Sequence, residues 1–255
     1  MSEGKSELAA SASWTYGHIL PNGITVLALA FGMTAFTYAA AGLIAPAIAC
    51  VLIAALLDAC DGRVARRMNT ASKFGAELDS LADVICFGAA PAFIVHQWGL
   101  NSFGLIGWLA CLLPTIAAAL RLARFNVMTA DANKPSWSSL YFMGVPAPAG
   151  AFLTLVPVYL EGAGWMDLRT SSLVGLVTLP LVAVLMVSTL PTFSGKQTQR
   201  KAMRVLFLPT LVLGVAAAAG LYLYPWQTLV IAALAYMLSF PFSYRSRRKK
   251  ILATG

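Results

Sequence analysis

The chain has 255 residues, of which 59% are hydrophobic and only 11% are charged, and its mean hydropathy is +0.75. This composition excludes an ordinary soluble domain, in which about a quarter of the residues are charged, and indicates an integral membrane protein. The net charge of +8 does not indicate a nucleic-acid partner, because the basic residues form short clusters between apolar runs, where they orient spans or meet anionic lipids.

The apolar runs predict an all-α bundle of about eight transmembrane helices. A span needs roughly 20 predominantly apolar residues. The candidate spans are 19–39, 42–60, 79–98, 102–123, 140–160, 172–190, 205–223 and 227–243. The fifth is the weakest prediction, because it contains Pro146, Pro148 and Pro157, and proline breaks or kinks a helix interior.

The loops between these spans differ in charge and so predict an orientation. Short cytoplasmic loops are enriched in Lys and Arg. Clusters of such residues follow the second, fourth, sixth and last spans, whereas the alternate loops hold a single arginine balanced by two acidic residues. We therefore expect both termini in the cytoplasm, with a polar tail (1–17) and a basic tail (245–255) flanking one membrane domain (18–244).

One polar segment, residues 58–83, stands out and contains half of the ten acidic residues of the chain. Its four aspartates are Asp58, Asp61, Asp79 and Asp83. The first two are three residues apart and the last two are four apart, so in helices each pair projects from one face. A polar link over about 63–77 would let the second and third spans run antiparallel and bring both pairs together at the cytoplasmic membrane surface.

Four carboxylates that face one another repel strongly unless cations lie between them. Hard divalent cations such as Mg²⁺ or Mn²⁺ prefer all-oxygen sites, and four aspartates suit one or two ions. Gly62 and Gly75 leave the backbone bare for close approach, and Arg66 offers a planar fork to phosphate oxygens. The segment therefore predicts a site for a phosphorylated substrate.

A purely structural alternative pairs Asp79 and Asp83 with Arg66 and Arg67 in a salt-bridged loop. Carboxylates at this density in a membrane region usually mark function, which favours the active-site interpretation.

The spacing D-x2-D-G-x2-A-R-x8-G-x3-D-x3-D is met in full by this segment. It resembles the signature of the CDP-alcohol phosphotransferases. This resemblance implies a membrane enzyme that transfers a phosphatidyl-type group from a CDP-linked lipid to an alcohol and releases CMP. It also implies roles for the matching residues. The implied metal ligands are Asp58, Asp61, Asp79 and Asp83, the general base is Asp83, and the nucleotide cradle is Gly62, Ala65, Arg66 and Gly75.

Other pieces of the chain resemble the bacterial and archaeal phosphatidylserine synthases of this superfamily. They are L-P-N at 20–22 with Thr25, S-K-F-G-A-E-L-D-S-L-A-D at 72–83, R-L-A-R-F-N at 121–126, G-V-P-A-P-A at 144–149 and P-T-F-S-G-K at 191–196. This likeness implies CDP-diacylglycerol and L-serine as substrates and an integral inner-membrane enzyme whose site faces the cytoplasm. Together with small-residue helix faces, it also leads us to expect a homodimer.

Four residues are candidates for binding the acceptor or phosphate, because serine needs a cation for its carboxylate. They are Arg121, Arg124, Asn126 and Lys196, all predicted on the cytoplasmic side. The basic ones are equally compatible with a topological role, and Asn22, a candidate for diphosphate binding, with a role at the helix start. The same reaction with glycerol 3-phosphate, inositol phosphate or choline, and a transporter, stay open as alternatives.

Overall fold

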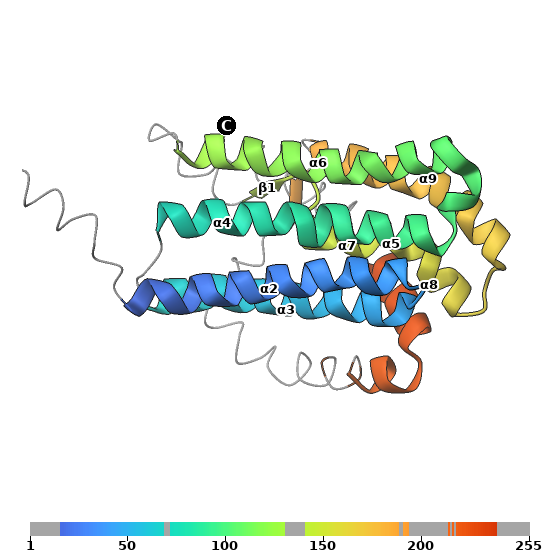
Figure 1. Cartoon of the computed structure of the whole chain (residues 1–255), viewed down its shortest axis with the longest axis horizontal. Helices are drawn as coiled ribbons and strands as arrows, with labels where there is room; N and C mark the ends of the chain where they lie inside the picture. The colour runs from blue at the N-terminus through green and yellow to red at the C-terminus, as the bar shows by residue number, and fades with distance from the viewer. Residues whose placement is uncertain are drawn as a thin grey trace, which may run out of the picture.

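The computed structural model describes residues 16–68, 72–130, 141–188, 191–193, 214, 216 and 218–238 (Figure 1). Within these ranges the chain is a bundle of long helices. The labelled helices are α2 (Tyr16–Ala40), α3 (Ile44–Met68), α4 (Lys73–Asp83), α5 (Ala90–Trp98), α6 (Gly104–Ala130), α7 (Ala147–Thr154), α8 (Val156–Gly162) and α9 (Leu168–Val187). A π-helix, η1 (Val84–Ala89), joins α4 to α5, and a 3₁₀ helix, η2 (Leu100–Phe103), precedes α6.

Five helical segments are long and apolar enough to cross a membrane, which confirms the predicted helices at the first four and the sixth positions. They are Leu20–Ala40, Ile44–Val64, Lys73–Trp98, Leu100–Met128 and Leu168–Val187. A shorter apolar helix, Pro225–Leu238, begins the predicted eighth span. Most of the seventh span, residues 1–15 of the predicted N-terminal tail and the whole C-terminal tail lie outside the described residues, so the total of eight spans and the orientation stay predictions.

The predicted fifth span, 140–160, is not one continuous helix. The structure has β1 (Tyr141–Met143) followed by the two short helices α7 and α8, which meet at Leu155. Its prolines stand at or just before the first turn of a helix, where a missing backbone N–H costs nothing. The fifth segment therefore enters the bundle as two short helices.

The link between the acidic pairs is much shorter than the predicted 63–77. Helix α3 continues to Met68, and α4 begins at Lys73 after its N-cap Ser72, whose Oγ accepts a hydrogen bond from the Gly75 N–H at 3.0 Å. The prediction was wrong because the polar end of α3 was interpreted as a loop. Arginine is a good helix former, and its charge is favourable near a helix C-terminus.

Helix α2 packs along α3, and the continuous α4–η1–α5 helix packs against both (Figure 1). The π-helix fits closely against α6, because a Cβ at Gly88 would lie 2.9 Å from Cβ of Ala118, and Thr115 Oγ1 donates a hydrogen bond to the Gly88 carbonyl at 3.2 Å. Asp83 immediately precedes this π-helix. Such segments are frequent at functional sites.

Two short strands, which the all-α prediction did not include, join distant segments of the chain. Strand β1 pairs antiparallel with β2 (Pro191–Phe193), with Phe142 opposite Thr192. Next to the pair, Gly144 has a φ of +77°, and a Cβ there would lie 2.9 Å from the Ser188 carbonyl oxygen. The pairing therefore brings the residues just before the 144–149 segment beside residues 191–193.

One of the two apolar clusters in the core contains small residues from several helices. We call it the inner cluster, and its buried members include Ala28 of α2, Ala54 of α3, Phe87 of η1, Ala117 of α6 and Ala233 of the helix Pro225–Leu238. Small side chains let helices approach closely in a membrane protein. Because these residues pack together, the neighbouring turns of their helices lie at the same level of the bundle.

Candidate active site

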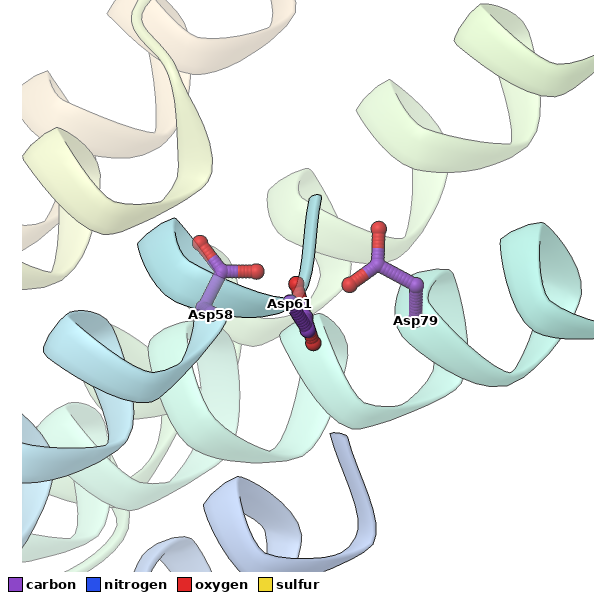
Figure 2. A group of neighbouring side chains, drawn as sticks. All are labelled: Asp58, Asp61 and Asp79. Atoms are coloured by element: carbon purple, nitrogen blue, oxygen red, sulfur yellow. The ribbon is translucent and has the colours of Figure 1, made fainter. Parts of the chain in front are cut away.

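Three aspartates converge where α3 meets α4. One carboxylate oxygen from each of Asp58, Asp61 and Asp79 lies within 4.8 Å of the other two. Figure 2 shows Asp61 between Asp58 and Asp79, whose carboxyl groups point toward one another across it. The predicted meeting of the two acidic pairs is confirmed for these three residues.

Asp83 lies one turn further along α4 and borders this group. Its carboxyl is within hydrogen-bonding reach of Asp58, which in turn reaches Asp79. Asp58 is therefore in contact with both Asp79 and Asp83 of α4. Asp83 has a second charged neighbour, because it interacts electrostatically with Arg121 of α6.

The donor set of this site fits a hard divalent cation. Carboxylate oxygens are the ligands that such ions prefer, and three of them are already gathered from two helices. Asp61 is buried and the other two are half-buried, so water screens their mutual repulsion only in part. An ion between them would remove this repulsion.

Thr25 of α2 orients one of these carboxylates. Its Oγ1 donates a hydrogen bond to Oδ2 of Asp61 at 2.7 Å, and both side chains are buried. Hydrogen bonds of this kind fix the direction of a metal ligand. The sequence did not predict Thr25 as a site residue, because its partner lies 36 residues away. The only signal was its place beside the L-P-N piece.

The bare backbone at Gly75 accommodates a side chain from α2. A Cβ at Gly75 would lie 2.9 Å from Oδ1 of Asn22 and 3.1 Å from Oγ of Ser72. Gly75 is in the first turn of α4 rather than in a loop. Asn22 of α2 lies directly against it. Gly62 follows Asp61 within α3. The side chains of Ala65 and Arg66 lie outside the described part of the chain.

The four candidates for acceptor binding differ in their surroundings. Arg121 is half-buried beside Asp83, whereas Arg124 is exposed. Asn126 Nδ2 donates hydrogen bonds to Oε2 of Glu77 and Oγ of Ser80, both at 3.1 Å, and so joins α6 to α4. Lys196 lies outside the described residues. No local pattern singles out Ser80, because its contact with Asn126 joins residues 46 positions apart.

Comparison with known proteins places this arrangement in a family. A sequence model described as CDP-alcohol phosphatidyltransferase matches residues 18–188, which include all but the first two residues of α2, the whole of α3 and α4, and all four aspartates. The chain belongs to the CDP-alcohol phosphatidyltransferase family. This confirms the resemblance that the D-x2-D-G motif predicted. The match ends before β2 and before the helix Pro225–Leu238.

Three similar proteins from different organisms have the same name. The chain is 35% identical over 240 residues to the CDP-diacylglycerol–serine O-phosphatidyltransferase of Mycobacterium tuberculosis, covering 90% of this chain and 79% of that protein. It is 40% identical over 174 residues to the enzyme of the same name from Helicobacter pylori, covering 68% and 71%. A third, from Methanocaldococcus jannaschii, is 33% identical over 148 residues, covering 57% and 64%.

Proposed function

We propose that this protein transfers the phosphatidyl group of CDP-diacylglycerol to the hydroxyl of L-serine, giving phosphatidylserine and CMP. The observation that carries the proposal is the gathering of Asp58, Asp61 and Asp79 beside Asp83, at the meeting of two membrane helices. The names of the relatives from three organisms support serine as the acceptor.

The proposed reaction is one displacement at the phosphorus bonded to diacylglycerol. The serine hydroxyl oxygen forms the new bond to this phosphorus, and the bond to the bridging oxygen of the diphosphate breaks, so that this oxygen leaves with CMP. Asp83 accepts the hydroxyl proton as general base. Arg121, which faces Asp83, is placed to hold a negatively charged group of either substrate.

We propose that Asp58, Asp61 and Asp79 hold Mg²⁺ or Mn²⁺, with Asp83 as a further ligand. A divalent ion bound there neutralises negative charge on the diphosphate of the lipid substrate. Thr25 holds Asp61 in one orientation, and Asp58 links the acidic residues of α3 to those of α4. The residues thus supply positioning and charge stabilisation, which carry most of the rate in phosphoryl transfer.

The candidates for nucleotide binding form one proposed side of the site. Gly62, Ala65, Arg66 and Gly75 line the nucleotide side, and Asn22, which contacts the Gly75 position, extends it from α2. We further propose that the protein lies in the inner membrane and that its site faces the cytoplasm, from which the water-soluble serine can enter and into which CMP can leave. We also propose that the protein is a homodimer whose contacts use small-residue helix faces.

A direct assay tests the proposal. Purified protein in detergent micelles receives CDP-diacylglycerol, Mg²⁺ or Mn²⁺, and one labelled alcohol at a time: L-serine, glycerol 3-phosphate, inositol phosphate or choline. We expect labelled lipid and equimolar CMP with serine alone, and none after chelation of the metal. Product with another alcohol but not with serine would overturn the acceptor assignment. No CMP with any alcohol would instead favour a transporter.

Thr25→Val should lower activity and raise the Mg²⁺ concentration needed for half-maximal rate, each by about tenfold, the lower end of the effect of removing a partner of a metal ligand. The substitution keeps the shape of the side chain and removes the hydroxyl, which bonds Asp61 and also the Pro21 carbonyl one turn earlier on α2. Initial rates at several metal concentrations measure it. Thr34→Val is the matched control, because Thr34 lies on the same helix and bonds only the Ala30 carbonyl in the described structure. Equal effects of the two variants would contradict the assigned role.

A further inference from the structure

Arg121 presents a buried donor beside the proposed general base. Its Nε is inaccessible to solvent and has no hydrogen-bond partner among the residues that the structure describes. Its charge interacts with Asp83. Burying a charged donor without a partner is costly, so native structures rarely do it without a reason. An oxygen atom of a substrate would satisfy this donor.

Tyr236 approaches the same arginine from the helix Pro225–Leu238, outside the range of the family match. Its half-buried ring packs against the inner cluster, and the residue interacts electrostatically with Arg121. The pairing joins positions 115 residues apart in the chain (236 minus 121).

The inner cluster explains why Tyr236 lies at the depth of the site. Each helix that carries a site residue contributes a buried residue to this cluster about one turn further inside the bundle. These pairs are Ala28 below Thr25, Ala54 below Asp58, Phe87 below Asp83 and Ala117 below Arg121. Residues three or four apart share a helix face. Ala233, buried in the same cluster, is three residues before Tyr236, so the two share a helix face. Tyr236 therefore lies on the same side of its helix as the inner cluster, one turn closer to the site.

We propose that Tyr236 and Arg121 together bind the carboxylate of the amino-acid acceptor, so that the helix Pro225–Leu238 contributes to acceptor specificity. This inference rests on the proposed function. A guanidinium forms strong, directed hydrogen bonds with a carboxylate, and a tyrosine hydroxyl donates a further one. In serine the carboxylate and the hydroxyl are carried by adjacent carbon atoms. A carboxylate held by Arg121 therefore leaves the hydroxyl close to Asp83.

The kinetics of Tyr236→Phe test this inference, because the substitution removes one oxygen atom and keeps the ring packing. We expect the KM for L-serine to rise about tenfold, as for the loss of a hydrogen bond to a charged group. The kcat and the KM for CDP-diacylglycerol should change less than about twofold, since Tyr236 is not assigned to that substrate. Serine methyl ester, which has no carboxylate, should be used or bound equally by both proteins.

The matched control is Tyr222→Phe, since Tyr222 is 87% exposed and has no assigned role. It should match the wild type in every constant. The melting temperature of Tyr236→Phe should also match that of the wild type.

Each other result overturns the inference in a distinct way. A higher KM for CDP-diacylglycerol alone would assign the pair to the diphosphate. A lower kcat with both KM values unchanged would mean that Tyr236 only supports packing. No change in any constant would mean that Tyr236 does not bind the serine carboxylate. If the wild type fails to use serine, the proposed function itself falls. If the wild type uses serine and the variant is unaffected, only this inference falls.

Discussion

Asp83→Asn should lower turnover about a thousandfold, within the range of losses seen when a general base is removed. The amide keeps the size of the side chain but does not take the proton of the attacking hydroxyl. Asp83 is the aspartate that borders the three-carboxylate group and interacts with Arg121, so it lies between the proposed metal ligands and the proposed acceptor-binding arginine. Phosphatidylserine formation at saturating substrates measures the loss.

Nucleotide binding separates this role from a loss of the whole site. Binding of CMP in the presence of Mg²⁺ should survive in Asp83→Asn, because the group of Asp58, Asp61 and Asp79 is intact. Asp167→Asn is the control. This exposed aspartate is the N-cap of α9 and has no assigned role in the site, and asparagine caps a helix equally well. A near wild-type rate for Asp83→Asn would show that another group accepts the proton.

The carboxylate cluster could be predicted from the sequence because spacing within a helix is a local property. Asp58 and Asp61 share a face of α3, and Asp79 and Asp83 share a face of α4, whatever the rest of the chain does. Apolar length likewise predicted the long helices. The boundary between α3 and α4 was placed badly, because a charged helix that extends beyond the membrane has the composition of a loop.

The contacts that orient the cluster could not be predicted, because they join distant parts of the chain. Thr25 reaches Asp61 across 36 positions, and Tyr236 approaches Arg121 from the last described helix. No local pattern marks such pairs. The π-helix after Asp83 depends on its fit against α6 at Gly88, which is also a tertiary effect.

Asp58→Asn should abolish the stabilisation of the protein by Mg²⁺ or Mn²⁺. An ion that binds only the folded state stabilises it by about 2.7 kcal/mol at a hundred times its dissociation constant. The melting temperature of the wild type should therefore rise as the ion is added. Asp58 reaches Asp79 and Asp83 and belongs to the three-carboxylate group, so Asp58→Asn removes one of the proposed metal ligands.

The same variant should melt no lower than the wild type when a chelator removes all metal, because replacing the Asp58 carboxylate removes its repulsion with the neighbouring carboxylates. The loss of stabilisation by the ion, together with an undiminished melting temperature without metal, distinguishes a metal ligand from a residue that only stabilises the fold. If Asp58 served only the packing of α3 on α4, Asp58→Asn would lower the melting temperature with and without the ion. Thermal melts of the wild type, Asp58→Asn and the control Asp167→Asn over a range of Mg²⁺ concentrations decide between them. An equal rise for all three proteins would mean that the ion binds elsewhere.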